Sequence, residues 1–287
     1  TGYGIIMASS REMRLRIKSV KDLSQVTRAL KTVSASKVRK AMASNAASLP
    51  YSEKAWQVLA DLARQPGHTS LHPLLCERST KINRVLVIMV SSDKGLAGSY
   101  NMNVLKHTLL HFDSIDKPVD YICIGKKGRD LLLRRKVRVI ADFSDLNDPV
   151  SFMDISPISR LVVNEFLRND YDEVYISHTR FETMTRQEPE ILKLLPLSVE
   201  EDSAAPQKSN TAKSVFIYEP AQEKILDEIV PRFTGIQIFQ AVLSSQASEH
   251  AARTIAMANA TDNANELVKI LTLEYNKVRQ QTITSDI

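Results

Sequence analysis

The amino-acid sequence predicts an α/β protein. Both ends of the chain form long helices, which pair as an antiparallel coiled coil and carry a Rossmann-like α/β domain with a mostly parallel sheet. Residues 9–49 and 236–287 contain no glycine or proline, the residues that end or kink helices. Between these segments, short β-branched runs alternate with helical stretches, as in βαβ units. We expect an N-terminal shaft helix with a short following helix over 7–63, the α/β domain over 81–218, and a C-terminal shaft helix over 220–287.

The N-terminal helix is expected over 9–49, a stretch of 41 residues that would be roughly 60 Å long. Its apolar residues are spaced by three or four positions and predict a continuous seam for a partner helix. They are Ile17, Val20, Leu23, Val26, Leu30 and Val33. Because a proline inside a helix removes a backbone hydrogen bond, we expect a break or kink near Pro50 and a second helical stretch over 51–63.

The C-terminal helix is the longest predicted element, with 52 residues after Gly235. Charged residues occur throughout it, so it does not match a membrane span, and a soluble helix of this length needs a partner. Small residues recur at every fourth position in its middle and would let another backbone approach: Ser248, Ala252, Ala256, Ala260 and Ala264. Larger apolar residues flank this stripe, with Ile236, Phe239, Val242 and Leu243 before it and Leu267, Ile270, Leu271 and Val278 after it.

A buried helix of an ordinary bundle is one interpretation of that pattern. A coiled coil is favoured because the pattern persists beyond three heptads with interleaved charges. Both long helices join the rest of the chain at the α/β domain, so they should pair antiparallel with their free ends at one tip. The last helix is longer by 11 residues, and we expect it to project alone there, above a compact domain that forms the foot of the stalk.

The central domain is predicted from four short β-branched runs, over 84–91, 119–125, 136–141 and 173–177. Helical segments lie between them, over 99–112, 126–135 and 151–167. Two later runs, over 191–197 and 214–218, are expected to form a further pair of strands joined by a polar loop. The return to helix begins soon afterwards, where Pro220 suits a first helical turn.

The net charge of +5 is concentrated near the N-terminus. Between Ser9 and Lys40, ten basic residues stand against two acidic ones, Glu12 and Asp22, which gives this segment a charge of +8. Such a field attracts an acidic partner, whether nucleic acid, anionic lipid or an acidic protein loop. A merely solvated helix face is the alternative.

Residues 91–98, SSDKGLAG, follow the first predicted strand and are the best candidate for a phosphate-binding loop. Neither glycine-rich nucleotide motif is present, so a tight turn into a helix capped by Ser99, or an exposed contact made by Lys94, is preferred. His107 and His111 have the spacing of zinc ligands on one helix face, but no third ligand joins them. No nucleophile stands with a base. We expect a non-catalytic protein with no cofactor and no metal.

Cys76 and Cys123 are too few for a disulfide framework, which indicates a reducing compartment. The longest apolar run, 85–90, is far too short to cross a membrane, and no secretory signal is visible. Met7 is expected to be the natural start of the protein, with residues 1–6 upstream of it.

Three stretches resemble the gamma subunit of F-type ATP synthase, the central rotor shaft of that complex. They are the first helix with its ASK step at 35–37, the turn SSDKGLAGSYN at 91–101, and residues 248–284, which are the most specific. The resemblance covers 7–287. It implies a shaft inside a ring of alternating alpha and beta subunits, with the domain meeting the epsilon subunit and the membrane c-subunit ring. It implies no nucleic acid and no direct membrane insertion.

The resemblance also implies partner contacts at seven residues. Lys94 and Gly95 match a turn that catches a beta subunit, and Leu30, where the family usually has methionine, lies with Lys31 near an acidic beta loop. Positions important for coupling are matched by Arg253, Gln280 and Thr284. The basic shaft would then meet acidic loops of the ring.

The chain departs from the family at its end, where 285–287 read Ser-Asp-Ile in place of a glutamate and a Gly-Ala-rich tail. It also lacks the inserted regulatory cysteine pair of photosynthetic members, so thiol regulation is not expected. A peripheral place at the cytoplasmic face of the bacterial plasma membrane is implied. Two rival interpretations remain. A basic coiled-coil nucleic-acid-binding protein would have aromatic residues among its basic ones, and this chain does not. A nucleotide-dependent enzyme would explain the α/β domain but not the shaft.

Overall fold

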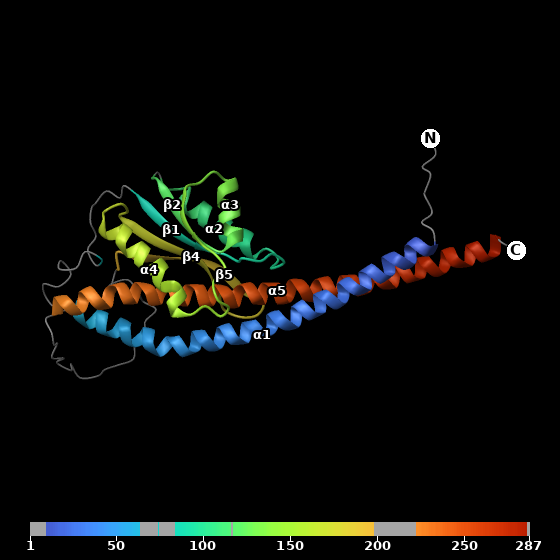
Figure 1. The fold of residues 1–287 in the computed structure, drawn as a ribbon, viewed down its shortest axis with the longest axis horizontal. Coiled ribbons are helices and arrows are strands. Elements are labelled where there is room, and N and C mark those ends of the chain that lie inside the picture. Colours follow the sequence, from blue (N-terminus) through green and yellow to red (C-terminus); the bar gives the residue numbers. More distant parts are fainter. Residues whose placement is uncertain (1–9, 64–73, 75–83, 116, 198–221, 286–287) are drawn as a thin grey trace.

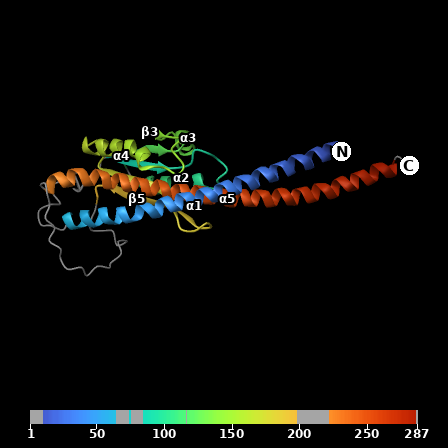
Figure 2. The ribbon, with the colours of Figure 1, turned by 60° about the horizontal axis from the view of Figure 1, so that its bottom comes forward.

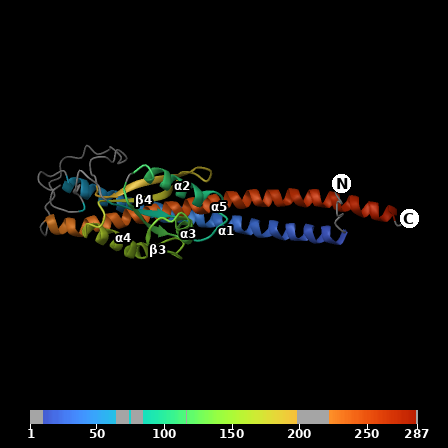
Figure 3. The same cartoon turned by 90° about the horizontal axis from the view of Figure 1, so that it is seen from above.

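The computed structural model describes residues 10–63, 74, 84–115, 117–197 and 222–285. Two long helices, α1 (Ser10–Ala63) and α5 (Gln222–Ser285), lie side by side and wind about one another (Figures 1, 2 and 3). The start of α1 and the end of α5 lie at one tip, where α5 extends further (Figure 1). The antiparallel coiled coil is therefore confirmed.

The α/β domain lies beside one half of the coiled coil, not at its end as a foot (Figure 1). The reason is that α5 belongs to both parts of the molecule. Val230, Phe233, Ile238 and Val242 of α5 are buried in the larger hydrophobic core of the domain. The shaft beyond the domain is formed by the start of α1 and the end of α5 alone (Figures 1 and 3).

The domain contains a five-stranded sheet in the order β3-β2-β1-β4-β5. Its strands are β1 (Val85–Val90), β2 (Val119–Ile124), β3 (Val139–Phe143), β4 (Glu173–Phe181) and β5 (Gln187–Leu195). The first four run parallel, and β5 is antiparallel to β4. Helices α2 (Tyr100–Phe112) and α3 (Lys126–Arg134) pack on one face, while α4 (Phe152–Leu167) and α5 cover the other. The mostly parallel sheet is confirmed.

The edge strand β5 differs from the prediction in extent and in partner. It begins at Gln187, four residues before the predicted run, and pairs with β4. Its first half, QEPE, contains Pro189, which has no backbone N–H to donate. Proline is rare inside strands, so the sequence did not predict a strand there. Among the described strands, β5 has a neighbour on one side only, a position where proline is tolerated. The predicted strand 214–218 lies outside the described residues.

Neither long helix ends at its proline. α1 continues through Pro50, and α5 begins at Gln222 and continues through Pro231 and Gly235. Pro50 is exposed, so the carbonyl that loses its partner there is open to water. Gly235 marks a close approach of α4: a Cβ at this position would lie 3.1 Å from the Ser159 Oγ. The predicted break near Pro50 is wrong.

The predicted apolar seam of α1 is wrong at three of its six residues. Ser24, Thr27 and Ser34 are buried against α5, at most 9% exposed. The predicted seam residues Leu23, Val26 and Val33 are more than half exposed, and Ile17, Val20 and Leu30 are half-buried. At these three positions the buried stripe is displaced by one residue toward small polar side chains, while the larger Met13 and Val38 of α1 are buried as well. On α5 the stripe likewise differs: Ser248 and Ala264 are buried, while Ala252, Ala256 and Ala260 are half-buried.

Candidate partner interface

The carboxyl edge of the sheet is closed by α5. In doubly wound sheets the ligand crevice lies at this edge, where the strand order reverses, here between β1 and β4. β1 pairs with β4 only as far as Ser177. Beyond that point the Oγ atoms of Ser245 and Ser244 accept hydrogen bonds from the backbone N–H groups of Thr179 (3.0 Å) and Phe181 (2.9 Å). The Ser248 hydroxyl donates to the Thr179 carbonyl at 3.1 Å. Serines of a helix thus complete the strand's hydrogen bonding.

What remains of the crevice is a cavity of about 40 Å³ lined by residues that include Tyr100, Gly125, Ser245 and Glu249. This volume holds about one water molecule. Burial raises the pKa of the Tyr100 hydroxyl, which stays protonated and donates to the Ser245 Oγ at 3.2 Å. The crevice is therefore filled by the chain's own side chains.

The turn at 92–98, which joins β1 to α2, is braced from within. The Asp93 carboxylate accepts hydrogen bonds from the backbone N–H groups of Lys126 and Asp145, both at 3.0 Å. It occupies the start of α3, the position where a phosphate would bind in a nucleotide site. Ser99 is the N-cap residue of α2, as predicted, although its side chain makes no cap hydrogen bond. The loop is a tight turn.

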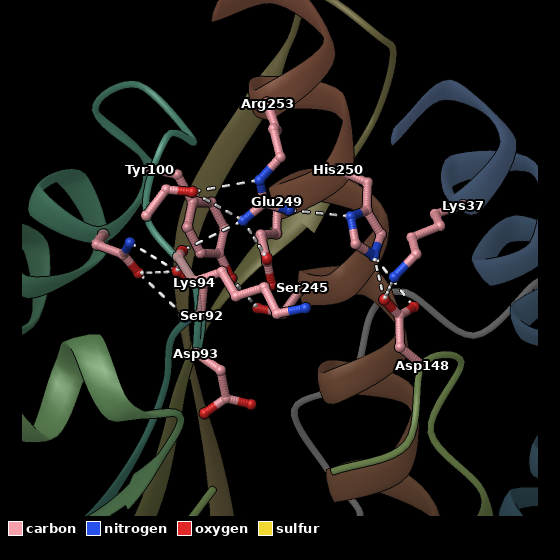
Figure 4. Close-up of polar contacts among 12 residues, drawn as sticks. Lys37, Ser92, Asp93, Lys94, Tyr100, Asp148, Ser245, Glu249, His250 and Arg253 are labelled. Atoms are coloured by element: carbon pink, nitrogen blue, oxygen red, sulfur yellow. Dashed lines mark hydrogen bonds and ion pairs between the residues drawn. The ribbon is translucent and has the colours of Figure 1, made fainter. Parts of the chain in front are cut away.

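Arg253 holds this turn against α5 (Figure 4). Its guanidinium donates to the carbonyl oxygens of Lys94 (3.2 Å) and Gly95 (3.2 and 3.3 Å) and pairs with Glu249 at 2.6 Å. The Arg253 side chain is only 10% exposed. Five donors in a rigid fork suit such multiple contacts. Predicted as a partner contact, Arg253 lies inside the chain and shapes the surface above it.

The network continues from Arg253 to α1 (Figure 4). The Arg253 Nη1 lies 3.2 Å from the His250 Nδ1, the His250 Nε2 lies 3.0 Å from Asp148, and Asp148 pairs with Lys37 at 2.7 Å. Because Arg253 only donates, His250 accepts at Nδ1 and donates from Nε2 to the carboxylate. Burial alone would raise the pKa of Asp148, but its hydrogen bonds with His250 and Lys37 hold that pKa below its ordinary value. One chain of polar contacts therefore joins α1, α5 and the turn.

The predicted contact residues occupy three levels of the molecule. Lys94 and Gly95 are exposed on the turn, at the level of Arg253. Lys31 is exposed and Leu30 half-buried on α1. The third level is the end of α5, where Gln280 and Thr284 are exposed and the Thr284 hydroxyl donates to the Gln280 carbonyl at 2.9 Å. The structure therefore brings Arg253, Lys94 and Gly95 together and leaves the other predicted contacts apart from them along the shaft.

Certain residues that hold the turn and link it to α1 and α5 were not predicted from the sequence. They are Lys37, Asp93, Asp148, Glu249 and His250. The spacing of Glu249 and Arg253, four residues apart on one helix, was a signal for their ion pair. His107 and His111 lie exposed on α2. Within the residues that the structure describes, no group of three metal-ligating side chains is present.

The fold and this site define a class of protein: a shaft-bearing chain in which two long paired helices extend beyond an α/β domain. The family model for ATP synthase, ATP-synt, matches residues 9–287. The gamma chain of ATP synthase from Herpetosiphon aurantiacus is 40% identical, over 98% of this chain and 96% of the relative. That of Roseiflexus sp. (strain RS-1) is 42% identical with the same coverage. This chain belongs to the ATP synthase gamma chain family.

Solved structures show the same fold at low sequence identity. The rotor of the Euglena gracilis mitochondrial ATP synthase in rotational state 1 matches with a TM-score of 0.64 and 19% identity, covering 96% of this chain and 98% of that one. The OSCP/F1/c-ring structure of the same complex in rotational state 3 matches with a TM-score of 0.66, covering 96% of this chain and 90% of that one. In the described part of the chain, no helix is long and apolar enough to cross a membrane.

Proposed function

We propose that this chain is the central shaft of an ATP synthase, turning inside a ring of alpha and beta subunits and coupling that rotation to ATP synthesis and hydrolysis. The observation that carries the proposal is the surface of the coiled coil. Large apolar side chains of the shaft are 44 to 71% exposed: Leu15, Leu23, Val26 and Val33 on α1, and Leu267, Ile270, Leu273 and Ile283 on α5. Large exposed apolar side chains in such number, on two helices that lie side by side, favour a protein interaction surface.

The surface of the shaft differs in charge and shape from one side to another. Coupling by rotation requires such an asymmetry. The excess of basic residues lies on α1, and α5 alone forms the tip (Figure 1). As the shaft turns, each beta subunit meets a different face. Because a contact shifts a conformational equilibrium only through its differential affinity for the states, these unlike faces can hold identical beta subunits in different states.

The domain is proposed to meet the epsilon subunit and the c-subunit ring, while the basic surface of α1 meets acidic loops of the alpha–beta ring. The proposed place is the cytoplasmic face of the bacterial plasma membrane, where the chain is held by its partners. Family membership supports this role and gives no support to the nucleic-acid-binding alternative. Lys94, Gly95, Leu30, Lys31, Gln280 and Thr284 remain proposed contact residues. Arg253 lies inside the chain, and its proposed part in the contact is to hold the turn that carries Lys94 and Gly95.

The test is ATP hydrolysis by alpha and beta subunits that are co-expressed with and without this chain. We expect one copy of the chain to co-purify with each ring and to raise turnover. A shaft shortened after Leu267 loses the exposed Leu273 and Ile283 and should show reduced turnover. Leu23→Gln should weaken association with the ring, while the matched control Leu133→Gln should not, since Leu23 is 55% and Leu133 54% exposed.

A chain that neither joins the ring nor changes turnover would sink the proposal. Binding to duplex DNA would then be measured at several salt concentrations. A steep loss of affinity with rising salt is the signature of phosphate contacts and would favour the nucleic-acid-binding alternative.

A further inference from the structure

His250 lies inside the molecule between a positive and a negative group (Figure 4). Its side chain is 5% exposed. On one side the Arg253 Nη1 lies 3.2 Å from the His250 Nδ1, and on the other the Asp148 carboxylate lies 3.0 Å from Nε2. Arg253 has donors only, so Nδ1 accepts and Nε2 carries the hydrogen. This arrangement requires a neutral imidazole.

A further proton can be added to His250 only at Nδ1, the atom that faces Arg253. A protonated Nδ1 cannot accept, so the hydrogen bond from Arg253 would be lost and two positive groups would stand 3.2 Å apart. The contact with Asp148 would become stronger, because it would then join an imidazolium to a carboxylate. A proton on His250 therefore weakens its contact with one neighbour and strengthens its contact with the other.

The charged side chains around this histidine oppose one another in pairs. Lys37 of α1 pairs with Asp148 at 2.7 Å, and Glu249 of α5 pairs with Arg253 at 2.6 Å. Tyr100 of α2 adds no charge, because burial raises its pKa, and Asp148 stays ionised because its hydrogen bonds lower its pKa. Histidine is the side chain whose charge ordinarily changes between pH 5 and 8. The imidazole can therefore gain a proton while the groups around it keep their charges.

The neighbour that would lose its contact is the residue that holds the turn at 92–98. Arg253 donates to the carbonyls of Lys94 and Gly95. The next residue, Leu96, has a φ of 64°, in the left-handed region that a leucine disfavours. Its side chain is 66% exposed, so its own packing does little to offset that strain. The turn therefore depends on contacts such as those of Arg253 to keep its conformation.

We propose that a proton added at the His250 Nδ1 detaches the imidazole from Arg253 and loosens the turn at 92–98 from α5. Lys37 and Asp148 keep α1 joined to the histidine in both charge states. A charge change at a histidine that biases a strained element is a general form of pH-sensitive switch. The switch needs no partner protein, so it does not depend on the proposed function.

Two measurements on the full chain between pH 8 and pH 5 test the switch. Nitrogen-15 NMR of the imidazoles shows which ring nitrogen of His250 carries a hydrogen, and at pH 8 we expect a neutral ring protonated at Nε2. Hydrogen exchange is measured at the N–H groups of Ser92 and Tyr100, which bond within the turn to the Asn101 side chain and the Ala97 carbonyl. As Nδ1 gains its proton, the protection factors of these amides should fall about tenfold, with the same midpoint. Protection factors already account for the effect of pH on free exchange.

His250→Gln keeps an acceptor and a donor but cannot take up the proton, so protection of its turn should not change with pH. The matched control is His111→Gln, at an exposed position on α2, which should keep the loss of protection in acid. Measurement stops at pH 5 because burial lowers the pKa of His178 to about 4, and that residue should stay largely neutral.

A neutral His250 protonated at Nδ1, or an imidazole still neutral at pH 5, would overturn the switch. A titration that leaves the protection of the turn unchanged would overturn it too, as would an equal loss of protection in His250→Gln. Because the NMR and exchange measurements use the unsubstituted chain, they decide the question even if His250→Gln does not fold.

Discussion

The hydroxyls of Thr27 on α1 and Thr261 on α5 lie 2.8 Å apart at the centre of the coiled coil, where both residues are buried. Each also lies within hydrogen-bonding distance of a carbonyl on its own helix, Ser24 at 3.0 Å and Met257 at 2.7 Å. The two hydroxyls have two protons between them for these three contacts. The pair therefore fixes the relative position of the helices at a modest gain in stability, as polar residues in coiled-coil seams do.

Removing one hydroxyl of this pair should destabilise the chain more than removing both. Thr27→Val leaves the buried Thr261 with one contact fewer, and we expect a loss of about 1 kcal/mol in the free energy of unfolding. Thr27→Val combined with Thr261→Val should restore most of that loss, because no buried hydroxyl then lacks its partner. Urea denaturation of both single variants and the double variant gives the coupling energy. Simple additivity of the two losses would contradict the shared hydrogen bond.

Asp148 should contribute stability that disappears in acid. Its lowered pKa means that the folded chain favours the carboxylate, so the contribution is full above the ordinary pKa of an aspartate and is lost as the pH falls through the folded value. Asp148→Asn should cost about 1 to 3 kcal/mol at pH 7 and progressively less below about pH 4. Thermal melts at pH 7 and pH 3 measure both.

The matched control for that variant is Asp145→Asn. Asp145 pairs with Lys126 at 2.7 Å, but its side chain is 71% exposed. An ion pair in water contributes little, so the expected loss is about 0.5 kcal/mol or less. Equal losses for the two variants would show that the link from Asp148 through His250 to Arg253 adds nothing.

His178 on β4 should also make the chain acid-sensitive, over a higher range of pH. Burial, with a smaller effect from the charge of Arg180, lowers the pKa of His178 from 6.5 to about 4. Between these values the unfolded chain binds the proton and the folded chain does not, so the free energy of unfolding falls as the pH falls. In His178→Leu the loss of stability between pH 7 and pH 4 should be smaller by about 2 kcal/mol. Urea midpoints across this range test it, and an unchanged pH dependence would contradict the burial of a neutral imidazole.

Arg253→Lys should loosen the turn at 92–98 while the chain stays folded. A lysine ammonium cannot bind two carbonyls, Glu249 and His250 with the fixed fork of a guanidinium. We expect faster hydrogen exchange at the amides of 94–98 and a loss of about 1 to 3 kcal/mol in stability. Arg160→Lys, on the exposed side of α4, is the control and should change stability by about 0.5 kcal/mol or less. Unchanged exchange in the turn would show that Arg253 does not hold it.

The long helices were predictable because the absence of glycine and proline is a local property of the chain. Which side of α1 is buried was not predictable in the same way. The apolar pattern predicts that Leu23, Val26 and Val33 are buried. In the structure, the buried residues at this part of α1 are Ser24, Thr27 and Ser34. The sequence pattern records the apolar surface of the shaft, and in the isolated chain that surface faces water.

The candidate site shows the same division. The exposure of Lys94 on a turn was predictable from the local sequence. The polar network beneath the turn was not, since His250 and Asp148 are 102 residues apart in the chain. Pairing over such a separation depends on the packing of α5 on the domain, which no local pattern encodes. The closure of the sheet edge by Ser244, Ser245 and Ser248 depends on that packing too.

Because α5 belongs both to the coiled coil and to the core of the domain, it affects the order in which the protein folds. α5, which follows the other described elements along the chain, supplies both the second helix of the coiled coil and part of the domain's core, including Val230 and Phe233. Domains usually fold as units during synthesis, N-terminal ones first. Until α5 emerges, α4 is the only described helix on its face of the sheet, and α1 lacks the helix with which it pairs. The coiled coil and the core of the domain can therefore be completed only once α5 has been synthesised. Until then, the apolar side chains that α5 covers are accessible to chaperones.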